Sequence, residues 1–307
     1  MSNDTAALAR SITWMGSKQS YYTARLMVDR NKVDDCFRAY AYFRWADDVV
    51  DDPLCSNDTR ISFINRQREL IESLYAGEWP ESLTIEEEII ADLISNNRSD
   101  SDGLRSFIEN FLAVIEFDAH RKGRVISQKE LDWYSGSLGK SVTDGIQYFI
   151  GNGAIYPEGD NRYLAATAAH ITHMLRDMVQ DVAEGFINIP GEYLEEHDLK
   201  PGGTSNPIFK TWVRAQVELA RRYFLEGKEY LDELNVLRCK IVAYWYCARF
   251  ERVLDMIQAD DYELRPEYNE RRRLGAWIHT AWLAAVITIK HFAKHILPQS
   301  QFSSARD

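Results

Sequence analysis

Hydrophobic positions recur with a helical period along most of this 307-residue chain. Between residues 33 and 50 the apolar side chains fall at i, i+3 and i+4, and Pro53 then ends the pattern. The same period predicts eight further helices, over residues 59–75, 86–94, 103–119, 128–150, 161–184, 209–231, 235–260 and 269–295. The pattern therefore favours an all-α protein.

No segment alternates polar and apolar residues as a half-buried strand would, and neither a P-loop nor a GxGxxG motif is present. Residues 151–160 and 200–207 are expected loops because of their Gly, Pro, Asp and Asn content. Asp160 or Asn161 is the expected N-cap of the helix that follows the first loop. Neither loop is long enough to divide the chain, so we expect one all-α domain over residues 1–307.

Charge and composition narrow the classes of partner. The chain has 36 Lys+Arg against 47 Asp+Glu, a net charge of −11, which argues against binding nucleic acid through its phosphates. Its four cysteines form no CxxC pair, and the N-terminus has no basic start followed by an apolar run. The most apolar stretch, residues 276–289, is too short to span a bilayer. We expect a soluble, cytoplasmic protein, and a peripheral contact with a membrane stays open.

The segment "FRWADDVVDD" places a first group of carboxylates on one helical face. Asp47 and Asp48 lie four and three residues before Asp51, and the apolar run "FRAYAYF" precedes them. Like charges at these spacings destabilise a helix unless a cation offsets them. Because a mostly apolar helix tends to be buried, we expect these carboxylates to face an enclosed space.

A second helix repeats the arrangement. Asp177 and Asp181 are four residues apart and His173 lies one turn earlier, while Arg44 and Arg176 lie beside the two clusters. A solvated face is the ordinary interpretation of one such cluster, but two with the same spacing in apolar helices favour a functional site. A set of carboxylate oxygens with few imidazoles favours Mg²⁺ over zinc or copper as the bound metal. The two clusters together suggest a site for a diphosphate carried on Mg²⁺ within a helical bundle.

These residues resemble a known family. "FRWADDVVDD" and "LRDMVQDVAEGFINIP" are similar to the two aspartate-rich motifs of the squalene/phytoene synthase family, the head-to-head isoprenyl diphosphate synthases. "SKQSYYTARLM" resembles the N-terminal stretch of that family, and Tyr134 in "ISQKELDWYSGSLGKSV" matches a tyrosine of it. The resemblance covers residues 17–265. It implies an isoprenoid-synthase helical bundle around a central cavity.

The resemblance also implies roles for individual residues. The side chains expected to hold three Mg²⁺ ions are Asp47, Asp48, Asp51, Asp177 and Asp181. His173 stands where the family usually has an asparagine, and it either ligates a metal ion or pairs with Asp177. Tyr134 joins the five aspartates as a catalytic candidate. The expected substrate-binding residues are Lys18, Ser20, Tyr21, Tyr40, Arg44, Arg176 and Gln180.

The reaction implied is the joining of two C15 or two C20 prenyl diphosphates through a cyclopropyl intermediate, giving a squalene-type or phytoene-type product. Aromatic side chains can stabilise the allylic cation, and the candidates are Tyr40, Phe43, Tyr134, Tyr148 and Phe149. The chain departs from the family pattern at Lys140, Thr143, Gln180 and Phe250. A single-substrate terpene cyclase and a non-catalytic assembly or binding protein on the same fold are therefore alternatives. No motif supports NADPH, so a reductive second step stays open.

Overall fold

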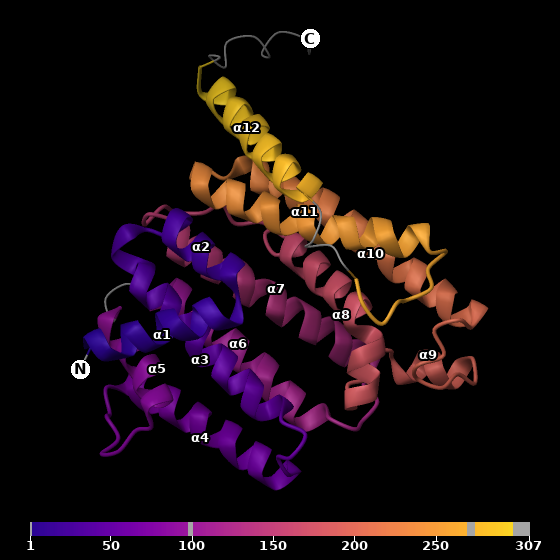
Figure 1. Ribbon diagram of the computed structural model, residues 1–307, viewed down its shortest axis with the longest axis horizontal. Helices are drawn as coiled ribbons and strands as arrows, with labels where there is room; N and C mark the ends of the chain where they lie inside the picture. The colour runs from indigo at the N-terminus through magenta and orange to yellow at the C-terminus, as the bar shows by residue number, and fades with distance from the viewer. Residues whose placement is uncertain (1, 98–100, 269–273, 297–307) are drawn as a thin grey trace, which may run out of the picture.

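The computed structural model describes residues 2–97, 101–268 and 274–296, and these form helices joined by loops (Figure 1). Within these ranges the single β interaction is an isolated bridge between Val125 and Ile187. The elements are α1 (Ser2–Gly16), α2 (Lys18–Met27), η1 (Arg30–Lys32), α3 (Val33–Asp51), α4 (Asn57–Ala76), α5 (Ile85–Asn96), α6 (Ser101–Arg121), α7 (Gln128–Ile150), α8 (Leu164–Glu184), α9 (Gly191–Glu196), α10 (Pro207–Glu233), α11 (Leu237–Ala259) and α12 (Leu274–Ile296). The predicted all-α fold is confirmed.

Most predicted helices appear within a few residues of their expected bounds, and α7 begins and ends where the pattern placed it. The predicted start of the last helix, residues 269–273, lies outside the described residues. The expected N-cap of α8 is wrong. That helix begins at Leu164, and neither Asp160 nor Asn161 caps it, because Asn161 instead donates its side-chain amide to the Glu226 carbonyl over 3.3 Å.

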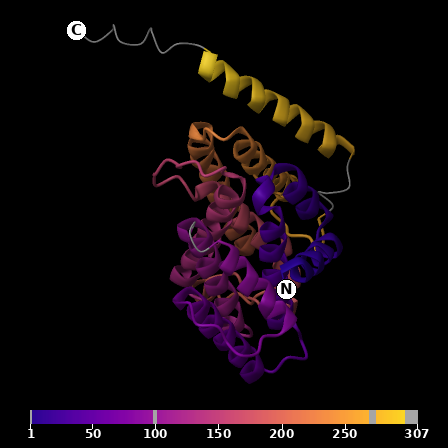
Figure 2. The same cartoon turned by 90° about the vertical axis from the view of Figure 1, so that its left-hand side faces the viewer.

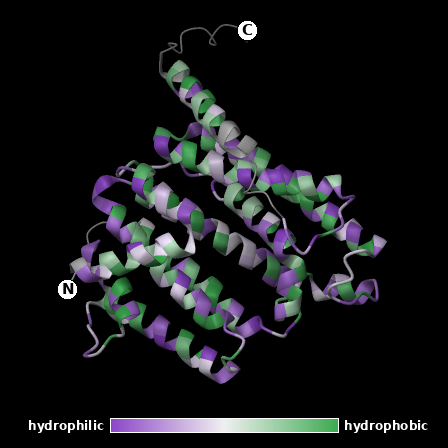
Figure 3. Cartoon of the chain, in the orientation of Figure 1, coloured by the Kyte–Doolittle hydropathy of each residue, from purple (hydrophilic) through white to green (hydrophobic). Residues whose placement is uncertain are grey.

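Close packing of α8 against its neighbours builds the centre of the bundle. Its first half is buried, and it lies between α7 and α10 (Figure 1). A Cβ at Gly139 of α7 would come within 2.3 Å of the Thr167 hydroxyl, and one at Gly227 of α10 within 2.4 Å of the Ala165 nitrogen. Glycine at these two contacts lets three helix backbones approach one another. Most helices carry both hydrophobic and hydrophilic residues, as amphipathic helices around a shared core require (Figure 3).

The last helix is placed differently from the others. α12 packs across α11 and extends from one end of the bundle in both views (Figures 1 and 2). Of the helices that the structure describes, none combines the length and the hydropathy needed to cross a membrane. α3 and α8, which carry the two aspartate motifs, lie inside the bundle and are connected through α6 and α7.

Candidate active site

The first aspartate motif occupies the last turns of α3, and its three carboxylates have different surroundings. Asp47 lines a large cavity, whereas Asp48 is exposed and accepts a hydrogen bond of 3.0 Å from Nε of Arg44. Asp51 is the last residue of α3 and is also exposed. The expectation that these carboxylates face an enclosed space is therefore met by Asp47 and is wrong for Asp48 and Asp51. The mixed exposure follows from the helical period, because Ala46 and Val50 occupy the buried face of these turns.

The second motif lies near the end of α8 and is held by a bidentate ion pair. Arg176 donates from Nε and Nη2 to Asp177 over 2.7 and 2.6 Å, and Nε2 of His173 lies 3.0 Å from the same carboxylate. Although burial opposes it, these contacts hold the pKa of Asp177 well below its usual range. Gln180 donates to Glu184 on the outside of the helix over 2.8 Å. The neighbours of Asp177 are therefore those of a tightly paired carboxylate.

A glycine turn ends α8 and returns the chain to the site. Gly185 has φ +91°, the left-handed conformation in which glycine is favoured, and the Phe186 N–H bonds the Asp181 carbonyl over 2.7 Å. The turn brings Asn188 back to Asp181, to which it donates from Nδ2 over 2.9 Å. The glycine of the second motif thus positions a partner for its last aspartate.

Asp118 of α6, which the sequence analysis did not select, lies between the two motifs. Tyr134 donates its hydroxyl to Asp118 over 2.8 Å, and Nε of Arg121 donates to the other oxygen over 2.6 Å. Arg121 also donates from Nη1 to Asn188 over 2.8 Å, which extends the network to Asp181. A lone aspartate in an apolar helix gives little signal, although Arg121 three residues later is a partner at helical spacing.

The electrostatics of the site show that Asp118 acts on carboxylates of both motifs. Burial raises the pKa of Asp47 to about 7 and that of Asp181 to about 8, and neighbouring carboxylates, Asp118 among them, add to both shifts. Asp51 is exposed to solvent on one side, but partial desolvation by the neighbouring chain and repulsion, most of all from Asp118, raise its pKa to about 6. The site therefore carries more negative charge than its own Arg and Lys residues offset.

These carboxylates suit a hard divalent cation, which their uncompensated charge would attract. Within the described residues, no three His, Cys, Asp or Glu side chains are already grouped closely enough to hold one metal ion. A bound cation would therefore draw carboxylates together across the site and relieve their repulsion.

A cavity of about 520 Å³ extends from the first motif into the bundle. Arg44 and Asp47 lie among its lining residues, and the rest of the wall is largely apolar. Its lining side chains are Ser17, Gln19, Ser20, Thr23, Ala24, Val28, Cys36, Ala39, Tyr40, Phe43, Arg44, Asp47, Phe107, Phe111, Val142, Gly145, Ile146, Phe149, Ile150, Val242, Trp245, Tyr246 and Arg249. The central cavity expected from the resemblance is present.

Three of the five expected aromatic residues, Tyr40, Phe43 and Phe149, line this cavity. Tyr134 and Tyr148 do not, so their placement in the cavity wall is wrong. Tyr134 is buried against Asp118, and Tyr148 is a core residue that donates to Asn97 over 2.5 Å. Both are on α7, and their hydroxyls are hydrogen-bonded to residues outside it, Asp118 of α6 and Asn97 at the end of α5.

The N-terminal stretch contributes one of its three expected substrate contacts to the cavity. Ser20 lines it, at the start of α2, where Ser17 caps the helix by accepting from the Ser20 N–H over 3.1 Å. Lys18 lies over the Trp14 ring, 5.4 Å from its centroid, and Tyr21 stacks on Phe37 at 5.3 Å. Neither Lys18 nor Tyr21 is part of the cavity wall.

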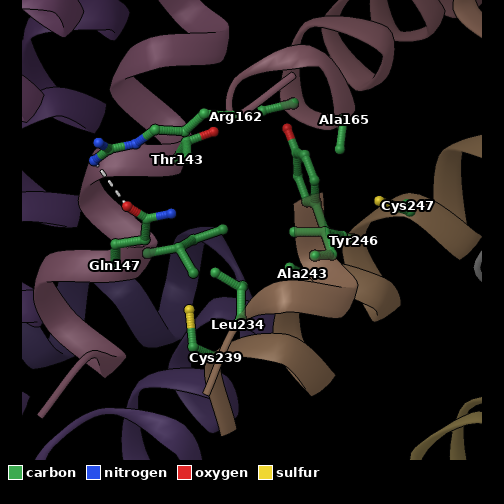
Figure 4. Close-up of a pocket in the computed structure, with 12 residues that line it drawn as sticks. Thr143, Gln147, Arg162, Ala165, Leu234, Cys239, Ala243, Tyr246 and Cys247 are labelled. Carbon is green, nitrogen blue, oxygen red and sulfur yellow. Dashed lines mark hydrogen bonds between the residues drawn. The ribbon is translucent and has the colours of Figure 1, made fainter. Parts of the chain in front are cut away.

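A second, smaller pocket of about 30 Å³ lies next to the large one, and Tyr246 and Ile146 belong to both walls. Figure 4 shows the Tyr246 ring on one side of this pocket and Arg162 and Gln147 on the opposite side. Arg162 donates a hydrogen bond of 2.9 Å to Gln147. Thr143 also lines it. The two side chains shared by both pockets separate them.

In a comparison with protein families, the squalene/phytoene synthase family matches this chain over residues 15–277. The chain is similar to a 15-cis-phytoene synthase from Synechocystis sp. (24% identical over 299 residues, 91% of this chain and 85% of the relative). It is also similar to a presqualene diphosphate synthase from Rhodopseudomonas palustris (26% identical over 183 residues, 58% of this chain and 60% of the relative).

Two solved structures share the arrangement of helices. One is squalene synthase HpnC from Alicyclobacillus acidocaldarius, with a TM-score of 0.66 at 18% identity, covering 86% of this chain and 97% of that one. The other is a dehydrosqualene synthase, with a TM-score of 0.67 at 15% identity, covering 96% of this chain and 98% of that one. At these identities the likeness is one of fold.

Proposed function

Because this chain belongs to the squalene/phytoene synthase family, we propose that it joins two C15 or two C20 prenyl diphosphates through a cyclopropyl diphosphate intermediate. Membership of this family makes it a prenyltransferase that condenses prenyl diphosphates head to head. The product would be of the squalene or phytoene type. Whether a reductive step with NADPH follows depends on the product, and the chain carries no nucleotide motif that favours it.

One observation supports this proposal above the rest. A largely apolar cavity of about 520 Å³ begins beside carboxylates whose charge is not offset. A prenyl diphosphate has the same division, with a charged head and a long apolar tail. The head would lie at the aspartates with bound cations, and the tail would lie in the cavity.

The residues that would hold Mg²⁺ are Asp47, Asp48, Asp51, Asp177 and Asp181. When bound, the ions would neutralise the leaving diphosphate, so that the allylic C–O bond can ionise. His173 would contribute through its contact with Asp177 or as a ligand itself. Asp118, Arg121 and Asn188 touch these residues or their neighbours and would hold them in place.

The chain's own side chains would act on the substrate in two ways. Arg44 and Arg176 would share their carboxylate contacts with the diphosphate oxygens, which suits the bidentate geometry of guanidinium. Tyr40, Phe43 and Phe149 would face the allylic cation and keep water from it. Because Tyr134 donates to Asp118, it would act by positioning that carboxylate.

Incubation of the purified chain with C15 or C20 diphosphate, Mg²⁺ and either NADPH or buffer tests the proposal. Release of diphosphate together with a C30 or C40 lipid supports it, and product mass identifies the chain length. Asp47→Asn and Asp181→Asn should each abolish turnover, whereas Asp160→Asn, an exposed carboxylate outside the site, should leave it unchanged. A C15 or C20 hydrocarbon would show a terpene cyclase instead, and no turnover with either substrate would favour a binding protein.

A further inference from the structure

The large cavity and the small pocket beside it are separated by two side chains. Of the described residues that line these spaces, only Ile146 of α7 and Tyr246 of α11 line both. Along α11, Val242 lines the large cavity and the next residue, Ala243, lines the small pocket. A single layer of side chains therefore divides the two spaces, and we call Ile146 and Tyr246 the partition.

The small pocket has an apolar interior and a fixed far wall. Most of its lining side chains are apolar, among them Ala165, Ala166, Leu231 and Leu234. Opposite Tyr246, Arg162 donates to Gln147 over 2.9 Å (Figure 4), and Gln147 donates to the Tyr230 hydroxyl over 2.8 Å. These bonds join α7 to α10 and to the loop before α8, so they hold the far wall in place. The partition, made of two side chains, is the wall that a substitution can remove.

The partition borders the part of the cavity that lies far from the aspartates. α7 starts beside them, where Tyr134 donates its hydroxyl to Asp118, whose charge acts on Asp47. Ile146 lies twelve residues further along the same helix, which is about 18 Å at a rise of about 1.5 Å per residue. A prenyl chain whose diphosphate lies at the aspartates would therefore reach the partition with the last part of its tail.

Building on the proposed function, we propose that the partition sets the longest prenyl chain that the protein accepts, and that the small pocket is a subsite for one further isoprene unit. With Tyr246 in place, the tail has to end within the large cavity. With a smaller side chain at this position the two spaces join, and the apolar pocket can take a longer tail. Thr143, where the chain departs from the family pattern, lies in the wall of the small pocket, so the family pattern does not specify this subsite.

Binding of substrate analogues that cannot ionise tests the proposal. The probes are the C15, C20 and C25 prenyl thiolodiphosphates, and calorimetric titration in the presence of Mg²⁺ gives a Kd for each. Tyr246→Ala should shift the preferred chain length upward by one isoprene unit. Relative to the chain that the unchanged protein prefers, the next longer one should gain about tenfold or more in affinity, because its last unit is then buried.

Tyr244→Ala is the matched control. Tyr244 lies on the same helix, donates to Asp232 over 2.9 Å and lines neither of the two spaces, so its loss should leave the preferred length unchanged. Adding Ala243→Val to Tyr246→Ala fills the small pocket and should restore the preferred length of the unchanged protein. Circular dichroism melting checks that each variant folds, and if Tyr246→Ala unfolds, Tyr246→Leu and Ile146→Ala make the same test.

The same preferred length in the unchanged protein and in Tyr246→Ala would overturn the proposal, as would a shift that Ala243→Val does not reverse. If the unchanged protein forms a C30 or C40 lipid while the length preference stays fixed in the variants, only the role of the partition is lost and the proposed reaction stands. If the unchanged protein binds none of the three analogues, the proposed function and the role of the partition are both wrong.

Discussion

Asp118 is the residue that links the two aspartate motifs, because it acts on carboxylates of both. It accepts hydrogen bonds from Tyr134 and Arg121, and its charge raises the pKa values of Asp47, Asp51 and Asp181. Its side chain is 15% exposed, so the repulsion is poorly screened by water. A carboxylate in this place increases the attraction of the whole site for a divalent cation.

Replacing Asp118 should therefore weaken metal binding while leaving the fold intact. Asp118→Asn keeps an oxygen that can accept from Tyr134 but removes the charge, and we expect the Mg²⁺ concentration for half-maximal diphosphate release to rise by about tenfold or more. Magnesium titrations of the initial rate measure this, with Asp160→Asn as the control. An unchanged titration would show that Asp118 does not influence the metal site.

The two partners of Asp177 differ in the number and burial of their contacts, and the difference leads to a test of the role of His173. Arg176 makes two short bonds to the carboxylate and its side chain is 14% exposed, whereas His173 makes one contact and is 47% exposed. Arg176→Lys cannot form the bidentate pair, and we expect it to lower kcat/KM by about a hundredfold. His173→Ala should cost only a few-fold, because Arg176 still holds Asp177. A large loss of Mg²⁺ affinity in His173→Ala would instead identify His173 as a metal ligand.

At the scale of single elements, the end of α8 sets the geometry of the second motif. Gly185 allows a left-handed turn, and the chain then returns to place Asn188 against Asp181. A Cβ at Gly185 would also lie 3.4 Å from the Gly123 nitrogen in the turn between α6 and α7. Glycine at position 185 therefore allows α8 to end in a left-handed turn and also allows this turn to pack closely against the turn between α6 and α7.

Gly185→Ala and Gly77→Ala form a matched pair for this idea. Gly77 ends α4 with φ +85° and no atom within 4 Å of an added Cβ. Both variants should lose about 1–2 kcal/mol of unfolding free energy, the cost of a left-handed alanine. Only Gly185→Ala should also raise the Mg²⁺ requirement, since only it displaces Asn188. Denaturant unfolding and magnesium titration of both proteins separate the two effects, and equal activity in both would argue against the positioning role.

At the scale of the whole molecule, folding places three carboxylates of the site where their ionised form is unfavourable. The folded pKa values of Asp47, Asp51 and Asp181 are about 7, 6 and 8, above the value near 3.9 expected in an unfolded chain. Folding therefore opposes their ionisation. Their contribution to stability is most favourable below about pH 4 and is lost as the pH rises toward 8.

Metal-free protein should accordingly melt at a lower temperature at about pH 8.5 than at about pH 6. The variant with Asp47→Asn and Asp181→Asn should show a smaller difference, because asparagine cannot ionise. Mg²⁺ with diphosphate should raise the melting temperature of the unchanged protein most at the higher pH. Differential scanning calorimetry measures all three, and parallel pH profiles for the two proteins would contradict the prediction.

Helix positions were determined by the sequence because burial of one face imposes a period of 3.6 residues, which is visible without a partner. That is why α3 through α8 could be predicted to within a few residues. α1 and α2 were not predicted, because they meet at Gly16 and Ser17 without a loop that would mark their bounds. Of the two, only α2 contributes side chains to the cavity wall. The domain bounds over residues 1–307 stay a prediction.

Two aspartate motifs and their spacing were likewise determined by the sequence, because helical neighbours at three and four residues share a face. Only the tertiary structure decided that Asp118 from another helix lies between them and that Tyr134 faces Asp118 and not the cavity. It also decided that α2 and α12, which lie near opposite ends of the chain, both pack against α11 (Figure 1). Each of these depends on the order in which helices pack, and local periodicity does not specify which helix lies against which.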